Sequence, residues 1–111
     1  MRLLRFLMFF SLVLLVGLGT GWAADTASIQ GKVVDSSGAL IPQAAVSITD
    51  LATNTVTHTT TDAAGEFVFK NVLAGPKVIN VERSGFEPFT LRFSPATQHS
   101  ITATLQVATL T

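Results

Sequence analysis

Residues 28–50 read SIQGKVVDSSGALIPQAAVSITD, and this stretch decides the fold class. Near its start Ile29 and Val33 fall on one parity, and near its end Val46 and Ile48 do the same, with polar residues between them. Alternation with a period of two places one set of side chains on a single face of a β-strand. The Asp-Ser-Ser-Gly segment between the two runs has the composition of a turn. The stretch therefore predicts two strands, each with one buried face, joined by a short connection.

The same pattern continues to the end of the chain. Segments that alternate or are dense in β-branched residues begin near residues 29, 44, 55, 66, 77, 89 and 99. Segments rich in Asp, Asn, Ser, Gly and Pro separate them, and no window after residue 23 shows a helical stripe. One apolar face per strand and this spacing predict an all-β fold, a seven-stranded antiparallel β-sandwich.

The aromatic residues of this region are predicted to fill its core. Phe67, Phe69, Phe89 and Phe93 all fall on the apolar parity of their strands. A sandwich of this size has a small margin of stability, so nearly every inward position has to be apolar. We therefore assign these rings to the core rather than to a ligand-binding platform.

The first 23 residues differ from the rest and read as a secretory signal peptide. Two arginines precede an apolar run that is interrupted by a single serine, and Gly21 and Ala23 occupy the −3 and −1 positions of a cleavage site. The competing reading is an uncleaved anchor, but the largely apolar stretch covers only residues 3–18, and a spanning helix needs about 20 residues. The sequence predicts a signal-peptide helix in residues 1–23 and one domain in residues 24–111.

Export follows from this reading, to the periplasm, the outer membrane or the extracellular space. The whole chain has seven basic and seven acidic residues. The leader holds two of the basic residues, so residues 24–111 carry five basic and seven acidic groups, a net charge of −2. A nucleic-acid partner is excluded because binding needs a basic patch. The absence of Cys excludes disulfides, a thiolate zinc site, a Cys nucleophile and a lipidated Cys.

A search for reactive groups gives no candidate. His58 and His99 are the only histidines and are far apart in sequence, whereas a zinc site needs three or four ligands. No G-x-S-x-G elbow or P-loop is present. The turn that begins at Asp62 offers one carboxylate, too few oxygens for calcium. We expect turn capping and solubility from the acids Asp35, Asp50, Asp62, Glu66, Glu82 and Glu87. The prediction is no catalytic, cofactor-binding or metal-binding residues, no cofactor and no enzyme activity.

An ordered set of residues resembles the carboxypeptidase regulatory-like domain family. The set spans roughly residues 28–107 and reads Ile29-x-Gly31-x-Val33-x-Asp35, Ser37-Gly38-Ala39-x-Ile41-Pro42-x-Ala44-x-Val46-x-Ile48, Thr61-Asp62-x-x-Gly65-x-Phe67-x-Phe69, Leu73 with Gly75, and Gly85-Phe86. The resemblance implies a transthyretin-like (prealbumin-like) sandwich without catalytic residues of its own. It also implies an accessory role on exported proteins. In bacteria many members stand directly after a signal peptide, at the N-terminus of TonB-dependent outer-membrane receptors.

Two positions of this motif carry specific expectations. Gly31 shares the inward parity of Ile29 and Val33, where a missing side chain lets a neighbour pack close. Lys77 stands where the family usually has an aromatic or apolar residue. Either its stem is buried with the ammonium at the rim, or the strand is shifted by one residue.

Two hypotheses for function remain open. The first is a non-catalytic interaction or spacer module at the cell envelope, whose partner binds an edge strand or is a receptor barrel. The Thr-rich residues 55–61 are a candidate contact edge, and the competing interpretation, which we favour, is an ordinary solvated strand. The alternative is a carbohydrate-binding module with a starch-binding-like fold, for which Phe86 is the one Phe outside a strand run. Contact with a membrane is expected only through the signal segment.

An isopeptide cross-link between the first and last strands is not expected. Lys32 lies in the first strand, but the last strand offers only Gln106. The sequence leaves open whether the chain is free-standing or the front of a receptor.

Overall fold

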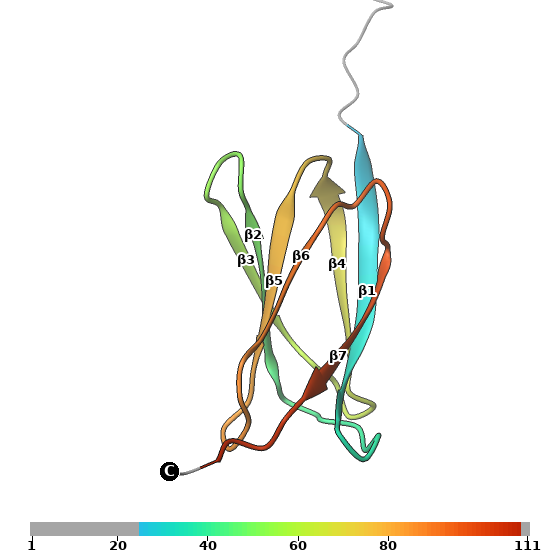
Figure 1. Ribbon diagram of the computed structural model, residues 1–111. Helices are drawn as coiled ribbons and strands as arrows, with labels where there is room; N and C mark the ends of the chain where they lie inside the picture. Colours follow the sequence, from blue (N-terminus) through green and yellow to red (C-terminus); the bar gives the residue numbers. More distant parts are fainter. Residues whose placement is uncertain (1–24, 110–111) are drawn as a thin grey trace, which may run out of the picture.

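The computed structural model describes residues 25–109, and all its regular elements are strands (Figure 1). They are β1 (Thr26–Asp35), β2 (Ala45–Asp50), β3 (Val56–Thr60), β4 (Glu66–Leu73), β5 (Lys77–Glu82), β6 (Phe89–Phe93) and β7 (Ser100–Leu105). The all-β prediction is confirmed, and each strand begins within a few residues of its expected start. No membrane-spanning helix occurs in residues 25–109. The predicted signal peptide lies outside the described residues.

The strands form two sheets that face each other. One sheet has three strands in the order β4-β1-β7, and the other has four strands in the order β3-β2-β5-β6. In Figure 1 the two layers stand side by side along their length. The β2–β3 and β5–β6 connections stay within the four-stranded sheet, and the other connections cross between sheets. The sandwich prediction is thus confirmed.

One strand pair departs from the antiparallel expectation. β1 and β7 are parallel, with Gly31 opposite Ile101 and Val33 opposite Ala103, whereas all other pairs are antiparallel. Alternating apolar and polar residues give the same inward face in either orientation, so the pattern could not reveal this. A parallel pair needs a long crossover, and here the whole chain between the first and last strands supplies it.

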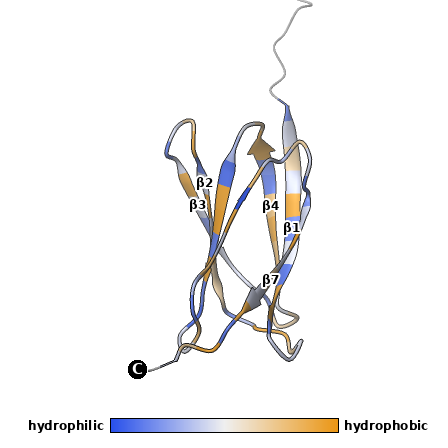
Figure 2. Ribbon diagram, in the orientation of Figure 1, coloured by the Kyte–Doolittle hydropathy of each residue, from blue (hydrophilic) through white to orange (hydrophobic). Residues whose placement is uncertain are grey.

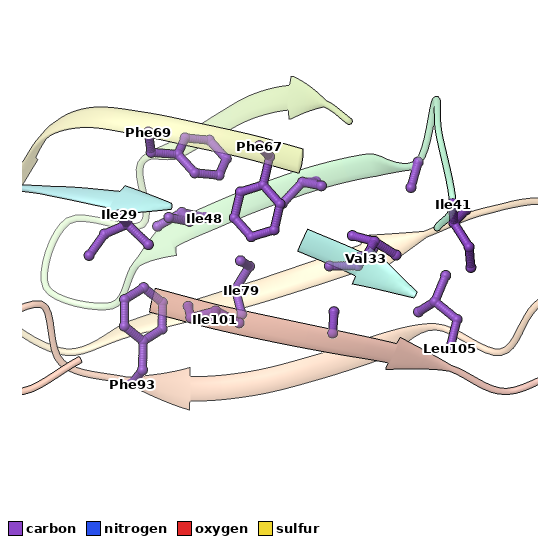
Figure 3. Packing of buried hydrophobic residues seen from close by; sticks show 14 residues of the cluster. Ile29, Val33, Ile41, Ile48, Phe67, Phe69, Ile79, Phe93, Ile101 and Leu105 are labelled. Carbon is purple, nitrogen blue, oxygen red and sulfur yellow. The ribbon is translucent and has the colours of Figure 1, made fainter. Parts of the chain in front are cut away.

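The core lies between the inner faces of the two sheets. Figure 2 shows apolar and polar residues alternating along the strands, and Figure 3 shows the apolar side chains meeting between the layers. Phe67, Phe69 and Phe93 are buried and Phe89 packs half-buried against the cluster, which confirms their assignment to the core. The buried apolar residues are Ile29, Val33, Ile41, Ala44, Val46, Ile48, Phe67, Phe69, Ile79, Val81, Phe93, Ile101, Ala103 and Leu105.

Gly31 makes the closest approach in the core. A Cβ atom placed there would overlap the carbonyl oxygen of Ile101 and come within 2.5 Å of Cζ of Phe67. The missing side chain therefore lets the Phe67 ring lie directly against the backbone of β1. This confirms the role expected for Gly31, which is to let a neighbouring side chain pack close on the inner face of the three-stranded sheet.

Two aspartates order the connections at one end of the sandwich. Asp35 Oδ1 accepts hydrogen bonds from the amides of Ser37 (2.8 Å) and Ala39 (3.0 Å). Asp62 Oδ1 accepts in the same way from the amides of Ala64 and Glu66, both at 2.9 Å. These side-chain bonds satisfy amides that no ladder reaches. The turn-capping role expected for both carboxylates is confirmed.

Candidate functional site

Lys77 is the only basic residue among the buried residues of the described chain. It lies on β5 with Ile79 and Val81, and all three point inward, so the strand is not shifted. Its Nζ atom lies 3.2 Å from Asp50 Oδ2 and 3.4 Å from the carbonyl oxygens of Ala74 and Gly75. Of the two alternatives, the buried stem is correct, and the ammonium ends at a carboxylate near the rim.

The ion pair has a structural rather than a reactive geometry. The hydrogen bond from the Ala52 amide (2.9 Å), more than the bond and charge of Lys77, holds the pKa of the Asp50 carboxyl below its ordinary value. Asp50 is therefore a carboxylate at neutral pH, and the ammonium of Lys77 is engaged by three oxygen acceptors. A cleft of about 250 Å³ lies beside the pair between β3 and β4. Lys70 of β4 also lines this cleft, together with Asp50 and Lys77.

The two histidines are not brought together. His58 lies exposed on β3, opposite Ser47 of β2, and His99 lies exposed just before β7 in the other sheet. Within residues 25–109, no three side chains of the His, Asp or Glu type gather as a metal ion would need. Both histidines therefore occupy separate positions at the surface.

Phe86 does not form an exposed aromatic platform. It is half-buried, packs against the core cluster and forms an isolated β-bridge with Val107. Its amide donates to the carbonyl of Arg83 at 3.0 Å. The ring therefore stabilises the corner between β5 and β6.

The strongest candidate site is the free edge of β3. β3 is the outer strand of the four-stranded sheet, so the expected edge position of the Thr-rich segment is confirmed (Figure 1). Flanking the strand, Asp50 N donates to Thr55 O at 2.9 Å and Thr61 N donates to Ala44 O at 3.0 Å. Because an antiparallel ladder alternates, odd-numbered residues of β3 bond to β2. The amides and carbonyls of the even-numbered residues point away from the sheet, at Val56, His58 and Thr60.

β4, the edge strand on the same side of the sandwich, is protected. The amide and carbonyl of Glu66 are both occupied by Asp62, each at 2.9 Å. A β-bulge lies near its other end, where the register with β1 shifts and Asn71 has a φ of 58°. Glu66 and Lys70 also place charges along this strand. Bulges and charges discourage pairing with another chain, and β3, a strand of five residues, has neither.

The other two edges are limited in different ways. β6 carries Arg92, and Pro88 precedes it. β7 is uncharged, but the chain just beyond it is already paired, because Glu87 N donates to Gln106 O at 2.8 Å. An added strand would meet the β5–β6 connection there. Among the four edges of the described residues, β3 is therefore the most open.

Comparisons with known proteins agree with the architecture. A profile of the carboxypeptidase regulatory-like domain family matches residues 28–108. The fold is similar to part of 3-chlorocatechol 1,2-dioxygenase from Rhodococcus opacus 1CP (13% identity, TM-score 0.64, 78% of this chain and 62% of that chain). It is also similar to part of the TIE protein of Bacillus anthracis (11% identity, TM-score 0.60, 78% and 17%). A further similar structure is the Streptococcus pneumoniae pilus adhesin (22% identity, TM-score 0.52, 63% and 9%).

These likenesses establish the fold alone. The identities are low, and the chain spans less than two thirds of each of these structures. No curated protein sequence matches the chain. The reactions of the dioxygenases therefore carry no implication for this sandwich.

Proposed function

The chain belongs to the carboxypeptidase regulatory-like domain family, and we propose that it is a non-catalytic accessory module that acts outside the cytoplasm by contacting another protein. The family match and the sandwich fold support the general class. The distant likenesses to dioxygenases do not argue for catalysis, because they concern the fold only. His58 lies on β3 and His99 lies just before β7 of the other sheet, and three of the acidic residues are engaged in turns: Asp35, Asp50 and Asp62.

One observation carries the contact role: the free edge of β3. Its residues Val56, His58 and Thr60 present unpaired amides and carbonyls, with no charge, proline or bulge to prevent pairing. An extended segment of a partner can add to such an edge through main-chain hydrogen bonds. Phe86, which packs against the core, offers no comparable support for carbohydrate binding.

Export is proposed from the leader, and a place at the cell envelope from the family resemblance. The pattern of residues 1–23 supports secretion, and the family resemblance supports a place at the cell envelope, including the front of a TonB-dependent receptor. Expression of the full chain in a bacterium tests this. We expect the product to be found outside the cytoplasm, with an intact mass that corresponds to a chain starting at Ala24. Because residues 24–111 contain no Trp, Tyr, Cys or Met, the mature product should also show almost no absorbance at 280 nm. A product that keeps its leader in the cytoplasm would refute export.

The contact role is tested by photo-cross-linking in the producing cells. A photoreactive residue at His58 on β3 should give a discrete cross-linked protein product. The same residue at Thr90 on β6 serves as the matched control, since both positions are exposed on outer strands. Equal products at both positions, or none at His58, would exclude β3 as the contact edge.

A further inference from the structure

The residues of β3 read almost the same in both directions. Val56-Thr57-His58-Thr59-Thr60 has β-branched residues placed symmetrically about His58. We propose that the partner of the β3 edge is a second copy of this chain, and that the two β3 strands pair antiparallel about His58. This inference rests on the contact role proposed above and names the partner of that same edge.

The main-chain geometry suits a two-fold pair. The unpaired amide and carbonyl groups belong to Val56, His58 and Thr60, which are evenly spaced about the centre of the strand. In an antiparallel pair centred on His58, that residue exchanges both hydrogen bonds with its symmetry mate. Val56 of each copy then exchanges both bonds with Thr60 of the other. Every free group of the edge finds a partner, and the two four-stranded sheets become one continuous sheet.

The side chains permit this register. Thr57 of one copy lies opposite Thr59 of the other, and Thr–Thr pairs are favourable across antiparallel strands. Val56 lies opposite Thr60, and the two His58 side chains lie side by side on the outer face. No charged side chain of β3 opposes another in this register, whereas β6 would bring the charge of Arg92 into any such pairing.

The surroundings of the edge also favour a second copy. Two of the exposed large apolar residues, Val56 and Leu73, lie on β3 and β4 along this side of the sandwich. Leu73 lines the cleft between these strands together with Thr55 and Thr57. An added molecule would cover this side, where the chain exposes apolar surface and carries no protecting charge on β3.

The groups facing His58 are uncharged. On β2 its cross-strand neighbour is Ser47, flanked on the same outer face by Ala45 and Thr49. On its own strand the neighbours on that face are Val56 and Thr60. The charged residues of β4, Glu66 and Lys70, belong to the other sheet. A charge introduced at position 58 will therefore act mainly on its counterpart in the second copy.

Matched proline substitutions test which edge pairs. Thr60, Thr90 and Thr102 are exposed threonines on β3, β6 and β7, and ladder alternation directs each amide to a free edge. Sedimentation of the mature chain should show a monomer–dimer equilibrium. Thr60→Pro should weaken it by about tenfold or more, since it removes one donor per copy and adds a steric clash. Thr90→Pro and Thr102→Pro should leave it unchanged.

Charge variants test the register without touching the backbone. His58→Lys and His58→Glu should each weaken dimerisation, because like charges meet at the two-fold axis. Mixing the two variants should restore a heterodimer at least as stable as the wild-type dimer. Both substitutions are at an exposed position, so circular dichroism should show folded protein.

Several outcomes would overturn the proposal. If the wild-type chain stays monomeric up to about 1 mM, its self-association is too weak to serve a function, and the proposal is wrong. Loss of the dimer in Thr102→Pro would assign it to β7, and failure of the mixed variants to associate would reject the register. A cross-link from His58 to a different protein, with a monomeric purified chain, would refute self-pairing while supporting the contact role.

Discussion

The two sheets of this sandwich differ in how closely their residues pack and in how accessible their edge strands are. The three-stranded sheet contains the closest packing, where Phe67 lies against Gly31, and its β4 edge is capped by Asp62 and bulged at Asn71. The four-stranded sheet contains the buried Lys77, paired with the partly exposed Asp50, and leaves β3 open. The first sheet is tightly packed, while the second combines a polar group in its core with a free backbone edge.

The difference shows how a small domain can offer a contact edge without losing its fold. The groups free on β3 are main-chain atoms that no core residue depends on, since the odd-numbered residues alone bond to β2. The packing that stabilises the domain lies mostly elsewhere. Substitutions in the tightly packed three-stranded sheet should therefore lower stability more than changes at the ion pair of the four-stranded sheet, and the following predictions test that ranking.

The largest effect is expected in the three-stranded sheet. Phe67 is 3% exposed and makes an edge-to-face contact with Phe69 at a centroid distance of 6.0 Å. Phe67→Ala should lower the free energy of unfolding by about 3–5 kcal/mol, because it removes a buried ring and leaves a cavity. Urea denaturation measures this. Val68→Ala, at the neighbouring position, which is 48% exposed, should change it by less than about 0.5 kcal/mol.

Gly31→Ala should cost somewhat less, about 1–3 kcal/mol, because the new methyl group overlaps Ile101 and the Phe67 ring. A double variant with Phe67→Leu should lose less than the sum of the two single changes, since the smaller side chain relieves part of the clash. Thermal and urea unfolding of all three variants measure the coupling. Strict additivity would show that Gly31 and Phe67 do not constrain each other.

Thr61, just after β3, bonds to the connection between β1 and β2, and its substitution should have an intermediate effect. Its buried Oγ1 accepts from Ala44 N and donates to Ile41 O, each at 2.8 Å. Thr61→Val keeps the shape but leaves both backbone groups without this partner, which should cost about 1–3 kcal/mol. Thr61→Ser keeps the hydroxyl and should lose less. An equal loss in both variants, measured by urea denaturation, would show that the methyl group matters as much as the hydrogen bonds.

Features written locally in the sequence could be predicted. Strand positions follow from alternation, the Asp35 and Asp62 turns from their side-chain chemistry, and the role of Gly31 from its parity. The Thr-rich segment could be expected at an edge because its inward positions carry threonine rather than large apolar residues. Each of these inferences needs only neighbours along the chain.

Features that depend on two distant segments could not be predicted. The parallel β1–β7 pair has the same alternation as an antiparallel one. Asp50 became the partner of Lys77 only through the register of β2 with β5. The bulge at Asn71 and the pairing of Glu87 with Gln106 likewise depend on which strands meet. The openness of β3 relative to the other edges could therefore be judged only in the folded chain.

The smallest effect is expected at the ion pair of the four-stranded sheet. Replacing a buried ionic partner by an apolar residue of similar length is often close to neutral, whereas removing its counter-charge is not. Lys77→Met should therefore change the melting temperature at pH 7 only slightly. Asp50→Asn should lower it more, because the ammonium of Lys77 stays buried with only carbonyl acceptors.

The pH dependence separates the pair from the turn that Asp50 also caps. The folded pKa of Asp50 lies below its ordinary value of 3.8, so its contribution to stability is present above that value and is lost as the pH falls through the lower folded pKa. Because the Ala52 amide is the largest cause, Lys77→Met should keep most of this acid-induced loss. Asp50→Asn should remove the contribution of Asp50 and leave that of Asp35, whose pKa the Ser37 hydroxyl lowers. Melting curves between pH 2 and 7 measure both variants. An acid profile of Lys77→Met that matches that of Asp50→Asn would show that the ammonium, rather than the turn, controls this carboxylate.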